Sequence, residues 1–223
     1  MTVIAAVPYP GGVAIATDLL MTSRTLTDLS REELRDECIK LHRGNHIVIG
    51  YRGKFWAHMK DEFDHSLNQL LVTHTIEELL SGLLAEFNHA CNKSMARSAK
   101  RRYGATVYRN ALALELMAPY HREGLVSVYH NGEGHVYYDA GNGSLAPLIR
   151  GGVLSPGRQV EDYQLYDYGL PKSRDGPVEA VETVSSVVRH WSIIRHDACS
   201  GLEAVVITKE GVRRAVYEPI ALQ

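Results

Sequence analysis

The sequence predicts an α+β protein, in which two antiparallel sheets are packed between outer helices as a four-layer αββα sandwich. Short apolar strands flank turns rich in Gly, Pro and Asn near both ends of the chain. Two amphipathic helical segments lie between these blocks, and a third precedes the last pair of strands. Because strands and helices come in separate blocks, a parallel α/β sheet is not expected. The length suits one domain spanning residues 1–223.

Composition narrows the classes of function. The chain has 223 residues, 45% of them hydrophobic and 22% charged, and a formal net charge of -2. This balance gives no general attraction to nucleic acid or to anionic membranes, so neither is expected as a partner. The three cysteines are odd in number and lack paired spacing, which favours a reducing compartment. With no signal peptide and no apolar run of about 20 residues, we expect a cytoplasmic protein.

The first element is a β-hairpin. Thr2–Val7 is expected to form a buried strand, Pro8–Gly12 a turn, and Val13–Thr17 the returning strand. If the hairpin is tight, Asp18 returns to the level of Thr2. The pattern therefore predicts that a hydroxyl and a carboxylate lie side by side at one end of a sheet.

The next elements are two strands and two helices. Residues 39–50 are expected to form two strands around a turn at 43–45. Apolar residues at helical spacing predict a first helix over 55–71. A second helix is expected to open at Thr75 with a capping box completed by Glu78, and to end near the basic residues 100–102.

The second half of the chain returns to strands. Asn131-Gly132 indicates a hairpin turn. Residues 155–177 are expected to form an extended loop and 178–195 a helix with an apolar stripe. Apolar or alternating segments are expected as strands at 105–108, 111–118, 125–130, 135–140, 204–208 and 212–217.

Thr2 is a candidate nucleophile. A threonine hydroxyl is weak and needs an adjacent base. If Met1 is removed, Thr2 exposes its own α-amine, whose ordinary pKa is about 8. That amine can accept the hydroxyl proton, with Asp18 to set geometry and charge. If Met1 is retained, the amine becomes an amide and the general base is missing.

The chain resembles a known family at several points. The stretch TVIAAV–GGVAIATD is similar to the opening of β-type proteasome subunits and of the bacterial HslV peptidase, which are N-terminal-nucleophile hydrolases. IVIGYRG, residues 47–53, resembles the strand and glycine turn that line that family's substrate groove. HDACSG, residues 196–201, matches the Asp-x-x-Ser-Gly motif that follows the family's long C-terminal helix.

This resemblance implies both a function and an assembly. It implies a threonine peptidase that hydrolyses peptide bonds of peptides or unfolded proteins inside stacked homo-oligomeric rings. It also implies an ATP-dependent unfoldase as a partner, and neither a cofactor nor a metal. Catalytic roles fall on Thr2, Asp18, Asp197 and Ser200, and substrate-binding roles on Met21, Thr22, Tyr51 and Gly53, whose backbone N–H would bind the oxyanion.

One departure concerns the lysine that the family places beside the terminal threonine. Alignment of the apolar residues on either side of Lys40 places Glu37 at the lysine position. Strand alternation then predicts Lys40 on the opposite face from Glu37. A carboxylate at 37 would lie near Asp18 and remove the expected cation. Arg52 or Arg24 is the alternative source of positive charge.

This departure leaves other functions open. One is a catalytically impaired, ring-forming scaffold subunit of the same fold. Another is a non-peptidase amidohydrolase, because a fold does not determine the chemistry. His130, Glu133 and His135 could suggest a metal site in which the hairpin brings the two histidines face to face. A third ligand is not evident, and no metal is expected.

Overall fold

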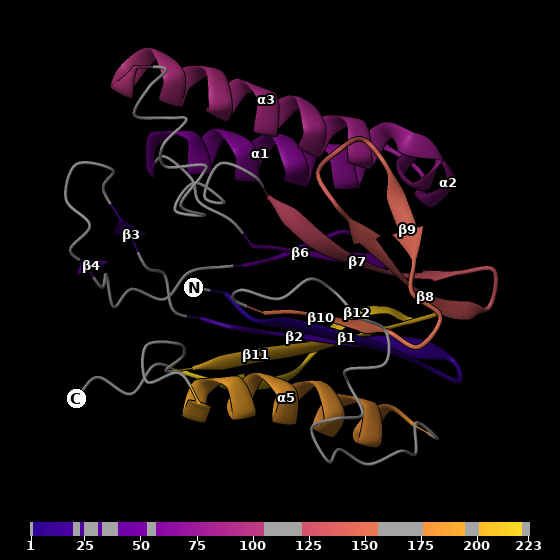
Figure 1. The fold of residues 1–223 in the computed structure, drawn as a ribbon. Coiled ribbons are helices and arrows are strands. Elements are labelled where there is room, and N and C mark those ends of the chain that lie inside the picture. Colours follow the sequence, from indigo (N-terminus) through magenta and orange to yellow (C-terminus); the bar gives the residue numbers. More distant parts are fainter. Residues whose placement is uncertain are drawn as a thin grey trace.

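The computed structural model describes residues 2–19, 23–24, 31–32, 40–52, 57–104, 122–155, 176–194 and 201–219. In these residues two five-stranded antiparallel sheets lie face to face, and helices cover both outer faces (Figure 1). This arrangement confirms the predicted α+β class and its two antiparallel sheets.

The first sheet has the strand order β10-β1-β2-β11-β12, with every neighbouring pair antiparallel. Its hairpin turn is shorter than predicted, because Pro8 and Tyr9 continue β1 and only Pro10-Gly11 form the turn. In the described residues β10 pairs with β1 only as far as Ala6, so Pro8 interrupts no described pairing on that side. The strands are β1 (Ile4–Tyr9), β2 (Gly12–Asp18), β10 (Gly152–Leu154), β11 (Leu202–Thr208) and β12 (Gly211–Glu218).

The second sheet has the order β5-β6-β7-β8-β9. Asn131 and Gly132 form its β7–β8 turn with φ of 52° and 87°, the positive values typical of a two-residue hairpin. Strands β3 (Ser23–Arg24) and β4 (Arg31–Glu32) pair separately. No strand was predicted for β3, β4, β9 or β10. The sheet consists of β5 (Leu41–Arg43), β6 (Ile47–Arg52), β7 (Glu123–His130), β8 (Glu133–Asp139) and β9 (Leu145–Pro147).

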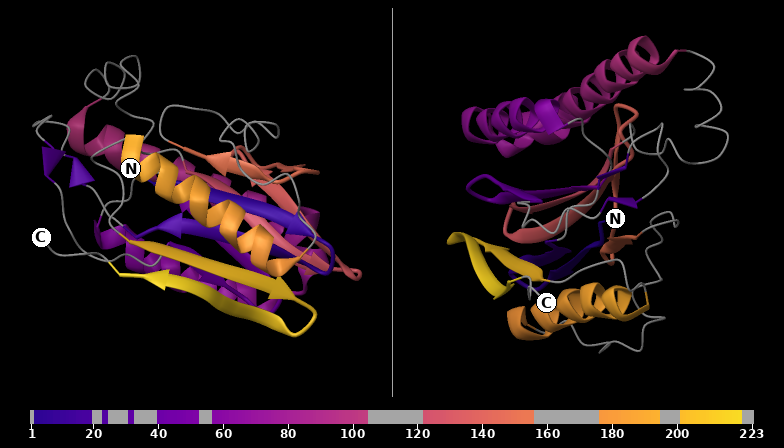
Figure 2. Two further views of the ribbon diagram at one scale, coloured as in Figure 1. Left: turned by 90° about the horizontal axis from the view of Figure 1, so that it is seen from below. Right: turned by 90° about the vertical axis from the view of Figure 1, so that its left-hand side faces the viewer.

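Helices cover the outer face of each sheet (Figure 2). The second sheet carries α1 (Ala57–Thr73), α2 (Ile76–Glu78), η1 (Leu79–Leu83) and α3 (Leu84–Tyr103), and the first carries α5 (Pro177–Ile194). The predicted capping box is confirmed: Thr75 accepts from the Glu78 N–H, and the Glu78 side chain accepts from the Thr75 N–H. The predicted second helix contains a π-helical turn at Gly82, whose φ is 134°.

Strand alternation divides the apolar core into three clusters. On β1, Ile4 and Ala6 pack between the two sheets, whereas Val3, Ala5 and Val7 pack against α5. On β6, the odd-numbered residues pack against the helices of the second sheet. The central strands of each sheet are therefore buried on both faces, and the β1–β2 hairpin lies between β10 and β11 of its own sheet. The predicted strands at 105–108 and 111–118, and nearly all of the predicted loop at 155–177, lie outside the described residues.

The two sheets approach each other closely where Gly134 faces Gly12. A Cβ on Gly134 of β8 would lie 2.0 Å from the carbonyl oxygen of Gly12 on β2.

We expect Gly134→Ala to lower the free energy of unfolding by about 3 kcal/mol, because backbone rather than a movable side chain must shift. Gly132→Ala, whose Cβ meets open space but whose φ is +87°, should cost about 1 kcal/mol. Urea unfolding measures both, and equal losses would contradict this account.

Candidate active site

The open end of the β1–β2 hairpin brings the start of the chain against Asp18. The N–H of Val3 donates to Oδ1 of Asp18 at 2.7 Å, and the N–H of Asp18 donates to the carbonyl of Val3 at 3.3 Å. The hydroxyl of Thr17 donates to the same carbonyl at 3.0 Å. The carboxylate of Asp18 thus accepts from the peptide bond between Thr2 and Val3 and is fully buried.

Thr2 lies beside this carboxylate. The nitrogen that donates to Asp18 belongs to the peptide bond between Thr2 and Val3. With standard bond lengths, the Cα of Thr2 is therefore no more than about 5.6 Å from Oδ1 of Asp18. Thr2 itself is half-buried. The predicted proximity of Thr2 and Asp18 is confirmed, and their catalytic roles stay predictions.

The cation at Asp18 is Lys40, which corrects the sequence interpretation. Its Nζ donates to Oδ2 of Asp18 at 2.6 Å, and the two side chains are 7% and 0% exposed. Strand alternation does not restrict Lys40, because it precedes β5, which begins at Leu41. The expectation that Lys40 could not fill the lysine position was therefore wrong. Glu37, which was assigned to that position, lies outside the described residues.

Both oxygens of Asp18 are thus bound by donors, one by a backbone amide and one by an ammonium. A carboxylate taken out of water is tolerated only when it is paired and hydrogen-bonded. The arrangement holds a positive charge, and a negative charge that balances it, next to the residue that carries the candidate hydroxyl. It can therefore favour negative charge that develops on that hydroxyl oxygen.

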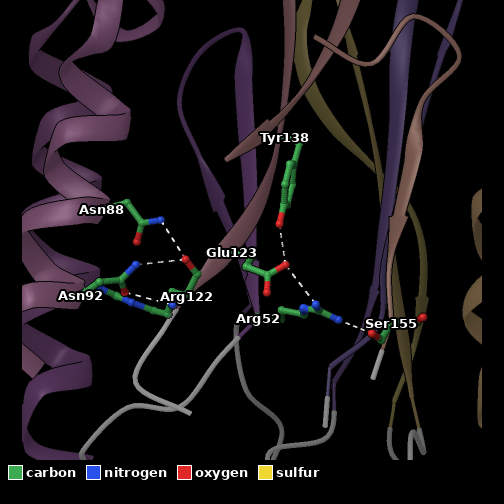
Figure 3. A network of polar contacts seen from close by, with 7 residues as sticks. All are labelled: Arg52, Asn88, Asn92, Arg122, Glu123, Tyr138 and Ser155. Carbon is green, nitrogen blue, oxygen red and sulfur yellow. Dashed lines mark hydrogen bonds and ion pairs between the residues drawn. The ribbon is translucent and has the colours of Figure 1, made fainter. Parts of the chain in front are cut away.

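Arg52 has a different role from the one considered in the sequence. It pairs with Glu123 at 3.0 Å and donates to the carbonyl of Ser155, while the hydroxyl of Tyr138 donates to Glu123 at 2.8 Å (Figure 3). Burial and the Glu123 carboxylate raise the pKa of Tyr138. Because Ser155 follows the partner of Ile4 on β10, Arg52 links the two sheets at the Thr2 end. The side chain of Arg24 lies outside the described residues.

Tyr51 was given a substrate-binding role by the resemblance, and this role stays a prediction. Its side chain is 6% exposed and faces the helices of the second sheet. Its hydroxyl donates to Asp139 at 3.1 Å, and its ring meets the edge of Phe63. Burial raises the pKa of Tyr51 well above its usual value. Tyr51 lies in the core because the odd-numbered residues of β6 face the helices.

A polar network surrounds Tyr51 behind the site. Asp139 accepts from Asn88 as well as from Tyr51, and also from the N–H of Gly141. Asn88 and Asn92 both donate to the backbone carbonyl of Arg122 (Figure 3). The guanidinium of Arg122 lies 3.7 Å from the centre of the Phe63 ring, and burial lowers its pKa. The network fixes the start of β7 against α3.

Several predicted site residues cannot be placed. The described chain resumes at Gly201, the last residue of the HDACSG segment, and Leu202 then pairs with Asp18. Strand β11 therefore begins at the candidate site. The predicted residues that lie outside the described ranges are Met21, Thr22, Glu37, Gly53, Asp197 and Ser200.

Comparison with known proteins gives no family assignment. No protein-family model matches the chain, and no curated protein matches it. Within the described residues, no helix combines the length and the apolar character needed to cross a membrane. The same part of the chain contains no group of three or more His, Cys, Asp or Glu side chains placed to hold a metal ion. The functional argument therefore rests on the geometry around Thr2 and Asp18.

The pair between Lys40 and Asp18 can be tested through stability. We expect Lys40→Met to lower the free energy of unfolding at pH 7 by about 3–5 kcal/mol, because it leaves a buried carboxylate with no cation. The double variant Lys40→Met/Asp18→Asn should recover part of this loss, since no charge then remains buried. Urea unfolding of the wild type, both single variants and the double variant gives the coupling energy. Strict additivity would contradict a direct pair.

Asp139 predicts a pH dependence of stability. Burial raises the pKa of its carboxyl to about 6 from 3.8, although its hydrogen bonds oppose the rise. The folded state thus holds the proton more tightly than the unfolded state, so this stabilisation is present below pH 4 and is lost as the pH rises through 6. Asp139→Asn should remove a loss on the order of 3 kcal/mol between these values. Urea unfolding at pH 4 to 7 measures it, and parallel curves for both proteins would contradict it.

Proposed function

We propose that this protein is a threonine peptidase with the N-terminal-nucleophile hydrolase fold, and that Thr2 is its nucleophile. The observation that carries the proposal is the Asp18 carboxylate, which binds the Val3 N–H at 2.7 Å and the Lys40 ammonium at 2.6 Å beside Thr2. The arrangement of two antiparallel sheets between helices supports it, because the family that the sequence resembles has this architecture.

The proposed reaction has two stages. After removal of Met1, the α-amine of Thr2 takes the hydroxyl proton while Oγ1 attacks the scissile carbonyl. The amine then returns a proton to the leaving amine, so the peptide bond breaks and an acyl ester remains on Thr2. Water, deprotonated by the same amine, attacks the ester and releases the acid. The Lys40 ammonium stabilises negative charge near Oγ1, and Asp18 keeps that ammonium in place.

The remaining parts of the proposal come from the resemblance. Asp197 and Ser200 would hold the terminal amine, and the Gly53 N–H would bind the oxyanion. Met21 and Thr22 would contact the substrate backbone. Identical subunits would assemble into stacked rings that enclose the sites, and an ATP-dependent unfoldase would deliver unfolded protein.

The scaffold alternative depended on Glu37 at the lysine position and on a retained Met1. Lys40 supplies a buried cation at Asp18, which weakens the first of these two arguments. The remaining requirement is the removal of Met1, which creates the base. The amidohydrolase alternative differs only in substrate, since the same nucleophile attacks any accessible amide.

Covalent labelling tests the proposed nucleophile. The intact mass of the purified protein should show loss of Met1, and a peptide epoxyketone should add once, on Thr2. Thr2→Ser, which keeps a hydroxyl and an amine, should still be labelled, whereas Thr2→Ala should not be. Lys40→Met should slow labelling by about 100-fold or more, as expected when a charge that stabilises the transition state is lost.

Two outcomes would contradict the proposal. A protein that keeps Met1 and takes up no label is not an N-terminal hydrolase. A protein that is labelled at Thr2, yet cleaves neither unfolded protein nor a panel of fluorogenic peptides, is an amidohydrolase of another class.

A further inference from the structure

A second buried ionic cluster lies next to the candidate site. Glu203 on β11 is 3% exposed and pairs in register with Thr17, the residue before Asp18. Its Oε1 accepts from Arg43 of β5 and, at 2.8 Å, from Nε of Arg214 of β12. The two arginines come from different sheets, because β5 belongs to the second sheet and β12 to the first.

Strand β5 is short and lies at the edge of its sheet. It has three residues, pairs among the described strands only with β6, and contacts α1 through His42, which lies 3.7 Å from Asp64. Across the sandwich its segment meets the first sheet at three points: Lys40 at Asp18, Leu41 in the core between the sheets, and Arg43 at Glu203. These three contacts hold the segment carrying Lys40 against the first sheet.

We propose that Arg43 and Glu203 form a positioning pair that holds the Lys40 ammonium against Asp18. Glu203 and Asp18 lie on neighbouring strands of the first sheet, where Asp18 pairs with Leu202 and Thr17 with Glu203. Arg43 therefore contacts the first sheet at Glu203, one residue along β11 from Leu202, which pairs with Asp18. The catalytic consequence of this pair rests on the proposed peptidase function, whereas the positional claim does not.

Arg214 provides a matched control. It binds the same carboxylate oxygen, but it lies on the strand next to Glu203 in the same sheet. Its removal leaves the contact between the sheets intact. Its side chain is 53% exposed and that of Arg43 is 32% exposed, so both positions accept methionine without opening a core cavity.

The experiment compares Arg43→Met with Arg214→Met in the full chain through two readouts. Hydrogen exchange of the Val3 amide, which donates to Asp18, reports the site without any need for activity. We expect Arg43→Met to speed this exchange and to lower kcat by about 10- to 100-fold with little change in KM, because the ammonium shifts from the carboxylate. Arg214→Met should change both by no more than about 2-fold. Arg43→Lys, which keeps the charge, should recover most of the lost protection of the Val3 amide and most of kcat.

The results separate the two ideas. Equal effects of Arg43→Met and Arg214→Met on Val3 exchange would overturn the positioning pair, as would unchanged exchange in Arg43→Met. If Arg43→Met does not fold, the same comparison of Arg43→Gln with Arg214→Gln decides, because glutamine removes the charge and the guanidinium fork but keeps a polar side chain. If the wild-type protein takes no epoxyketone label, but Arg43→Met still speeds Val3 exchange, the positioning pair is supported and the peptidase is rejected.

Discussion

The contact between Lys40 and Asp18 is the interaction on which the candidate site depends. It joins the segment that enters the second sheet to the end of β2 in the first, and both charged groups are almost completely buried. An unpaired carboxylate at this position would be strongly unfavourable. The Val3 N–H binds the other oxygen of Asp18, so the same carboxylate fixes the chain start and the lysine. The position of Thr2 follows from these two bonds.

Strand alternation explains how one strand serves both the core and the site. Tyr51 and Arg52 are neighbours at the end of β6, and their side chains point to opposite faces. Tyr51 enters the core beneath the helices and reaches Asp139, whereas Arg52 crosses to the carbonyl of Ser155 in the first sheet. One strand end therefore anchors the helical layer and also ties the two sheets together near Thr2. The described part of the site is thus contacted from several layers.

Much of the fold could be predicted from local signals. The capping box at Thr75, the Asn131-Gly132 turn and the apolar stripes each depend on residues close in sequence, and the structure has them. Strands β9 and β10 could not be predicted, because they are only three residues long and β10 pairs with a strand about 150 residues away. Lys40 was misassigned because the sequence before it has no periodicity to set the register, and Lys40 itself precedes β5. The alternation of side chains along β6 could be read from the sequence, and it places Tyr51 on the same face as the apolar Ile47 and Ile49.

A buried ion pair is a poor explanation of stability, and this bears on what Lys40 and Asp18 do. Replacing such a pair by apolar side chains of similar volume is often neutral or stabilising, because desolvation cancels the attraction. The ammonium and carboxylate are therefore weak evidence for added stability, which is compatible with the chemistry proposed at Thr2. The Arg43–Glu203 contact differs, since Arg43 is partly exposed and retains some of its hydration. Its cost is lower, and its value lies in where it holds β5. In the proposed mechanism the Lys40–Asp18 pair would supply charge to the Thr2 hydroxyl, and the Arg43–Glu203 pair would keep that charge in position.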